Sequence, residues 1–190
     1  LARGIREARE AEGSTRNPVS KWLIREKEKE FAAALQAAAG IVVDALSNRE
    51  MIEPGTAAEI SVKTFAPEGS TVKVVKTELK APAGWTVESI EEPKPAPATG
   101  FRPRNETATS AAFFKAASPA SAEPTQPYWM EKPRPGAKFD WSEAGKAKNM
   151  PFDQPLMTAL VTMEVDGATF TVEREAQFRF ADDIRGEIRR

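Results

Sequence analysis

The strongest constraint on the fold is the spacing of apolar residues in the last third of the chain. There, apolar side chains occupy every second position of one stretch: Met157, Ala159, Val161, Met163 and Val165. The dipeptide Asp166-Gly167 follows, which is typical of two-residue hairpin turns, and a second alternating stretch covers 169–180. Because one face of each stretch is apolar and the other polar, we expect an antiparallel hairpin with one buried face.

Strand-like stretches also occupy the middle of the chain. Turn residues separate further segments with strand character: 59–65, 71–79, 85–90 and a short one around residues 111–113. No helical spacing follows residue 47, and the 15 prolines exceed the usual share, which fits long ordered loops. The sequence therefore predicts a mainly β fold, an antiparallel β-sandwich of immunoglobulin-like (Ig-like) type.

The first part of the chain has helical spacing instead. Residues 1–12 are typical of the end of a helix, and Asn17-Pro18 is a cap followed by proline at the first helical position. The main helix should cover 18–39, stop at Gly40, and bury a stripe that includes Ile24, Phe31, Leu35 and Ala38. We expect Trp22 to seal this helix against the sandwich or against another domain. The predicted organisation is a helical segment at 1–47 packed against a β-sandwich at 48–190.

One long connection stands apart from the strands. The segment 118–155, hereafter the excursion, is rich in prolines and carries Tyr128, Trp129, Phe139, Trp141 and Phe152. It is too long for an ordinary strand connection and too aromatic for a disordered linker, so we expect an ordered excursion packed on the sandwich. A shorter proline-rich connector is predicted at 93–100.

Composition limits the chemistry that this chain can perform. It contains no histidine and no cysteine, which excludes catalytic triads, Cys-His pairs and the usual zinc ligands. Lys plus Arg total 27 and Asp plus Glu total 28, so no bulk charge favours nucleic acid, and no apolar run is long enough to span a membrane. We therefore expect a non-catalytic chain without a metal or cofactor. A glycosidase using Asp140, Glu143 or Asp153 is a minor alternative, since acids in a loop are usually solvated.

The best candidate site lies on the excursion. Tyr128, Trp129 and Trp141 offer flat rings that could stack on sugars or fill a partner's pocket, and Arg134 and Lys138 could hydrogen-bond a glycan or a carboxylate. The alternative, which we favour, is that the rings form the private core of the excursion.

Some of these segments resemble a known family. Pro54-Gly55, the strands that follow, and the stretch 81–87 (APAGWTV) are similar to the alpha-galactosidase-associated (NPCBM-associated) β-sandwich family. In that pattern the Pro-Gly pair starts the first strand, and Gly84 turns the chain so that Trp85 plugs one end of the sandwich.

The order of the segments is more specific. Residues 27–35 (KEKEFAAAL), 124–130 (PTQPYWM) and 178–187 (FRFADDIRGE) resemble the region downstream of the catalytic domain in large bacterial PIG-L (LmbE-like) N-acetylglucosaminyl deacetylase family proteins. The resemblance implies a zinc-dependent deacetylase parent with a His-Pro-Asp-Asp-type motif, which this chain cannot supply. It also implies that this chain is a fragment and that its partner is the catalytic domain of the same parent, expected before Leu1. The resemblance further implies an extracytoplasmic location, although no signal in the sequence indicates one.

Three functions follow as hypotheses. The first is a non-catalytic accessory or scaffold region that positions the catalytic domain and contacts glycan weakly. The second is a carbohydrate-binding module in its own right, and the third is a purely structural protein-interaction module. No nucleic acid and no membrane insertion are expected in any of them.

Overall fold

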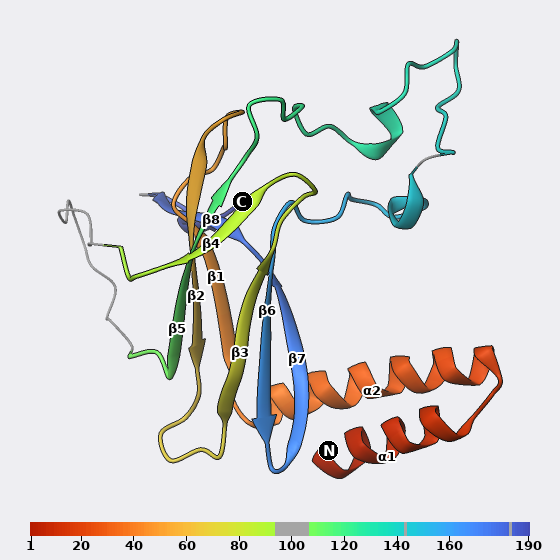
Figure 1. Cartoon of the computed structure of the whole chain (residues 1–190), viewed down its shortest axis with the longest axis vertical. Coiled ribbons are helices and arrows are strands. Elements are labelled where there is room, and N and C mark those ends of the chain that lie inside the picture. The colour runs from red at the N-terminus through yellow and green to blue at the C-terminus, as the bar shows by residue number, and fades with distance from the viewer. Residues whose placement is uncertain (94–106, 143, 183) are drawn as a thin grey trace.

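The computed structural model describes residues 1–93, 107–142, 144–182 and 184–190. Within these residues the chain forms two α-helices and nine strands, and the strands belong to a six-stranded and a three-stranded sheet (Figure 1). The fold is therefore mainly β, as predicted. Most of the connector predicted at 93–100 lies outside the described residues.

The two helices form an antiparallel hairpin. Helix α1 covers Ala2–Ser14 and α2 covers Pro18–Ala38. The Oδ1 atom of Asn17 accepts hydrogen bonds from the backbone N–H groups of Val19 at 2.9 Å and Ser20 at 3.1 Å, so it caps α2 as predicted. Gly40 follows the helix with a φ of 65°, a conformation that glycine adopts without strain.

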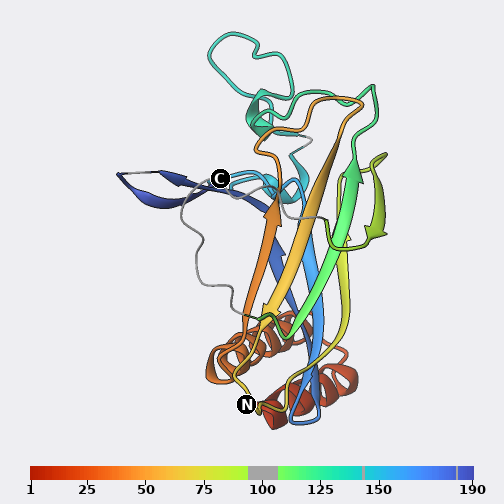
Figure 2. The same cartoon turned by 90° about the vertical axis from the view of Figure 1, so that its left-hand side faces the viewer.

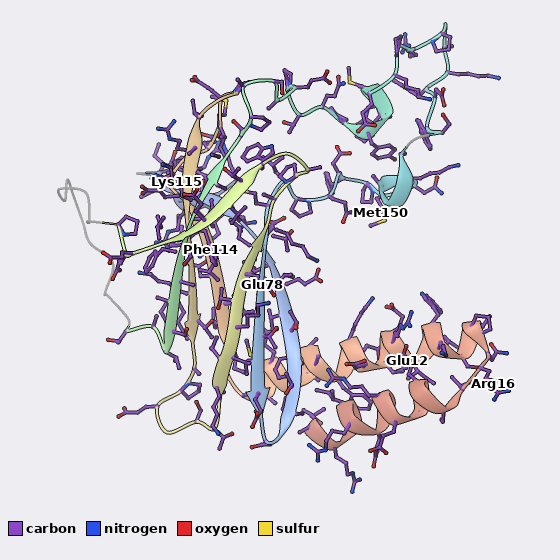
Figure 3. The ribbon with its side chains drawn as sticks, viewed as in Figure 1. Glu12, Arg16, Glu78, Phe114, Lys115 and Met150 are labelled. Atoms are coloured by element: carbon purple, nitrogen blue, oxygen red, sulfur yellow. The ribbon has the colours of Figure 1, made fainter. Side chains whose placement is uncertain are left out.

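Apolar packing and ion pairs hold the two helices together. Ile5 and Leu35 are buried, and a Cβ added to Gly4 would meet the Phe31 ring at 2.9 Å, so this glycine lets the helices approach closely. The Nε atom of Arg9 donates to Glu28 at 2.7 Å, and that of Arg25 donates to Glu12 at 2.6 Å. The hairpin contacts the sheets through β7 at one end and projects away at the other, where Glu12 and Arg16 lie (Figure 3).

The larger sheet has the order β4-β5-β2-β1-β8-β9. Its strands are β1 (Val42–Ser47), β2 (Ala57–Phe65), β4 (Thr86–Ile90), β5 (Ser110–Ala117), β8 (Gln177–Asp182) and β9 (Gly186–Arg189). Its pairs are antiparallel except that of β1 with β8, which run parallel over two residue pairs.

The smaller sheet is antiparallel and has the order β3-β6-β7. Its strands are β3 (Lys73–Lys80), β6 (Thr158–Val165) and β7 (Ala168–Glu175). The predicted hairpin turn between β6 and β7 is confirmed, since Asp166 and Gly167 have φ values of 50° and 72°, and Val165 pairs with Ala168.

A common core joins the two sheets and the helical hairpin. The five alternating residues from Met157 to Val165 are all buried, as the pattern predicted. They share one apolar cluster with side chains from the larger sheet and both helices: Ile5, Leu35, Ile60, Val62 and Phe114. Trp85 is half-buried and packs against this cluster, in line with the prediction that it plugs the core.

Strand β1 was not predicted, and it lies inside the range 1–47 that the sequence assigned to the helical segment. Ile41, Val43 and Ala45 are buried in the core, but Val42 and Leu46 on the opposite face are apolar as well. Apolar side chains on both faces erase the alternation that marks a strand, which is why the pattern missed it.

The stretch predicted as one strand at 169–180 is two strands. Strand β7 pairs with β6 as far as Glu175, and the N–H of Ala176 then donates to the carbonyl of Met157 at 3.0 Å. After this residue the chain crosses to the larger sheet, where β8 pairs with β1. The β8–β9 hairpin extends sideways from the sheets, as its dark blue ribbon shows (Figure 2). The Nη1 atom of Arg189 on β9 donates a hydrogen bond to Oδ1 of Asp44 on β1 at 2.6 Å, which connects this hairpin to the sheet. Hydrogen bonds to Glu187, the larger effect, and to Asp44 raise the pKa of Arg189 above its usual value.

Trp22 does not seal α2 against the sheets, because 60% of its surface is exposed. Trp22 belongs to the N-terminal half of α2, and Figure 1 shows that this half of the helix projects beyond β7. Of the predicted stripe, Leu35 is buried and Ile24 is half-buried. The prediction is wrong for Ala38, which is exposed, and for Phe31, which packs on Gly4 but keeps 36% of its surface exposed.

Candidate functional site

The excursion leaves the larger sheet after β5 and returns at β6. Its first residue, Ser118, is buried and donates its hydroxyl to the carbonyls of Glu53 at 2.9 Å and Thr56 at 3.2 Å. Beyond this anchor the chain extends away from the sheets instead of lying on them, and it projects on the same side as the helical hairpin (Figure 1). Its described part contains two short 3-10 helices, Tyr128–Met130 and Gly145–Ala147.

Tyr128 is the centre of the excursion. Only 6% of its surface is exposed, and it is not part of the core that the two sheets share. Its hydroxyl donates to the carbonyl of Met150 at 3.2 Å, and its backbone N–H donates to Oδ1 of Asp153 at 2.9 Å. These bonds join the two ends of the excursion around one ring, so Tyr128 holds the excursion together.

Two tryptophans stand edge-on to this tyrosine. The ring centroids of Tyr128 and Trp129 are 5.0 Å apart at an interplanar angle of 83°, and those of Tyr128 and Trp141 are 6.0 Å apart at 77°. Such T-shaped pairs are favourable for aromatic rings. Trp129 is half-buried, whereas 38% of the surface of Trp141 is exposed. The three rings predicted as a site therefore lie together, but they differ in how much of their surface a ligand could contact.

The predicted cations lie farther along the excursion. The Arg134 guanidinium lies over the ring of Phe139, 5.4 Å from its centroid, within the range of a cation–π contact. Arg134 and Lys138 are both exposed. The structure therefore joins Arg134 to Phe139 and not to either tryptophan.

The acidic residues of the excursion have structural partners. Oδ1 of Asp140 accepts the backbone N–H of Ser142 at 2.9 Å, and its other oxygen is 3.4 Å from Nζ of Lys132. The pKa of Asp140 is lowered below its usual value, mainly by hydrogen bonds from the side chain and the backbone N–H of Ser142, and further by the positive charge of Lys132. Asp153 accepts the N–H of Tyr128, while Glu143 lies outside the described residues. A lowered pKa keeps Asp140 ionised, whereas a catalytic acid needs a raised pKa.

Exposed apolar side chains occur along the excursion, and the sequence pointed to the aromatic ones but not to the methionines. The large apolar residues with much of their surface exposed are Met130, Phe139, Trp141, Met150 and Phe152. Phe152 is 80% exposed. A groove of about 910 Å³ runs along the base of the excursion, lined among others by Pro124, Tyr128, Asp153 and Leu156. Met150 lies on the part of the excursion that faces the helical hairpin (Figure 3).

The described part of the chain, which covers residues 1–93, 107–142, 144–182 and 184–190, offers neither a metal site nor a membrane-spanning helix. No cluster of carboxylates there is arranged to hold a metal ion. None of the helices in that part has both the length and the apolar character to cross a membrane.

Comparison with known proteins leaves the family open. No protein-family model, no curated protein and no solved structure matches this chain.

Proposed function

We propose that this chain is a non-catalytic accessory module that docks on a neighbouring folded domain through the excursion. The observation that carries the proposal is the set of exposed apolar side chains on the excursion, a segment in which Trp129 and Trp141 pack on the buried Tyr128 ring. Exposed apolar side chains gathered on one ordered loop are typical of a binding surface.

The composition of this surface favours a protein partner. Aromatic residues, methionine and arginine are enriched at protein interfaces, and the excursion presents Trp141, Phe152, Met150 and Arg134. Tyr128 and its hydrogen bonds hold the surrounding loop in one conformation, which lowers the entropy lost on docking. A preformed apolar surface of this kind suits a permanent contact between domains.

The partner that we propose is the catalytic domain of a PIG-L-like (LmbE-like) deacetylase, because segments of this chain resemble the region found beside that domain. The finer description of the two sheets as an Ig-like β-sandwich of the NPCBM-associated kind belongs to the same proposal. In this arrangement the chain positions the catalytic domain, and the partner supplies the zinc chemistry.

Phe152→Ala should weaken this docking. Truncating a central interface aromatic costs at least about 1 kcal/mol and often more, so we expect the dissociation constant to rise about tenfold. The measurement is a calorimetric titration of the chain with a purified PIG-L-like deacetylase domain. The control is Ile184→Ala, which removes an apolar side chain that is 95% exposed but lies between β8 and β9. If the unmodified chain does not bind, or if both variants bind equally, the docking proposal is wrong.

Glycan binding is a second candidate, and the exposure of Trp141 favours it. An exposed tryptophan face can stack on a sugar ring, and the polar residues Asp140 and Ser142 flank Trp141 in the chain. The Nζ atom of Lys132 donates to both of them. Tyr128 is buried and Trp129 is half-buried, so we assign Tyr128 to the core of the excursion and Trp141 to the contact.

The glycan candidate predicts that a soluble N-acetylglucosamine polymer retards the chain in affinity gel electrophoresis. Trp141→Ala should abolish the retardation, whereas Trp22→Ala, which removes an exposed tryptophan from α2, should leave it intact. A chain that migrates equally with and without the polymer would exclude this role.

A further inference from the structure

Helix α2 has an apolar patch on the face turned away from α1. Val19, Trp22 and Leu23 are 63%, 60% and 52% exposed, and they are neighbours on the helix surface. The residues that contact α1, such as Glu28 and Phe31, lie on the other face. An exposed tryptophan between two exposed aliphatic residues on a helix is typical of an interface.

The patch belongs to a longer stripe with a distinctive order. Spacings of three and four residues place six side chains along one side of α2: Val19, Trp22, Glu26, Lys29, Ala33 and Gln36. Large apolar side chains begin the stripe, opposite charges occupy its middle, and a small residue lies near its end. Glu26 and Lys29 form an ion pair at 2.8 Å, and their side chains are 40% and 73% exposed.

This order is complementary to itself when two copies run antiparallel. Trp22 then lies over the partner's Ala33, a large side chain against a small one, and Glu26 lies opposite the partner's Lys29. Twofold symmetry repeats both contacts. A parallel pair would instead set Trp22 against its own copy and bring like charges together, so charge and size both select the antiparallel arrangement.

The structure also has room for the incoming tryptophan. A groove of about 640 Å³ lies between the helical hairpin and β7. Lys29, Ala33 and Gln36 of the stripe line it, together with the ion-paired residues Arg9, Glu12, Arg25 and Glu28 that join α1 to α2. The strand side includes Phe170 and Val172. The part of the stripe around Ala33 therefore borders this groove, as the antiparallel pairing requires.

We propose that a second copy of this chain docks on α2, with the two α2 helices antiparallel and Trp22 of each copy in the groove beside Ala33 of the other. The contact uses a different surface from the excursion and does not depend on the docking partner proposed above. Because one helix stripe buries less surface than a standard interface, the dimer should be weak, with a dissociation constant in the range of about 1–100 µM.

Sedimentation velocity over a concentration series of the purified chain tests this proposal. The unmodified chain should shift from monomer to dimer, and Trp22→Glu should stay monomeric at every concentration. Circular dichroism serves to show that the variant keeps its helices. A chain that remains monomeric at about 1 mM, or a dimer that Trp22→Glu leaves intact, would overturn the proposal.

A charge reversal tests the pairing itself. Glu26→Lys places like charges opposite each other across the twofold axis and should weaken the dimer at least about tenfold. The double variant Glu26→Lys/Lys29→Glu restores opposite charges within the helix and between copies, so it should dimerise like the unmodified chain. If the double variant is no better than the single one, the antiparallel pairing is wrong.

Discussion

Replacing Tyr128 with alanine is expected to unfold the excursion while the two sheets stay folded. Tyr128 is 6% exposed, both tryptophans stand against its ring, and its hydroxyl reaches the carbonyl of Met150. The described excursion has only two short 3-10 helices, so few other bonds can hold it. The core shared by the sheets does not include Tyr128 and should survive. Limited proteolysis should therefore cut the variant within 118–155 and leave the strands resistant.

Tyr128→Phe is the matched control for this experiment. It keeps the ring and its contacts and removes only the hydrogen bond to Met150, a loss of about 0.5–1.5 kcal/mol. The excursion of this variant should resist proteolysis much as the unmodified chain does. Equal resistance of Tyr128→Ala and the unmodified chain would show that the excursion does not depend on this ring.

The largest loss of global stability is expected from Ile60→Ala. Ile60 is fully buried on β2, in the core that joins both sheets and the helical hairpin. Truncating a buried isoleucine removes apolar contacts and leaves a cavity, so the free energy of unfolding should fall by about 2–5 kcal/mol. Urea denaturation followed by circular dichroism measures this change.

Ile184→Ala makes the same chemical change where the side chain is 95% exposed. Its free energy of unfolding should stay within about 0.5 kcal/mol of that of the unmodified chain. A similar loss for both variants would mean that Ile60 is not in the common core.

The sequence predicted the elements whose apolar pattern is unambiguous. Alternation marked β2 and β6, and the cap at Asn17 marked the start of α2. Strand β1 escaped because consecutive apolar residues hide the alternation, and the rest of the fold decides which of them are buried. The break at Ala176 escaped because the pairing partner, not the residue pattern, decides where β7 ends.

The candidate site was predictable only in part. The sequence showed that aromatic residues gather at 118–155, and the structure brings Tyr128, Trp129 and Trp141 into contact. It could not show which ring is buried, because loops have no period from which exposure can be read. For the same reason Met130 and Met150, which are exposed on the same segment, were not recognised as part of one surface with its aromatic residues.

Photo-crosslinking from the excursion tests the docking proposal most directly. A photoreactive phenylalanine analogue replaces Phe152 in cells that make the natural protein containing this chain, and the same analogue at Ile184 is the control. Our proposal predicts that position 152 cross-links to peptides of a PIG-L-like catalytic domain and that position 184 does not. Cross-linking at position 152 no stronger than at position 184 would contradict it.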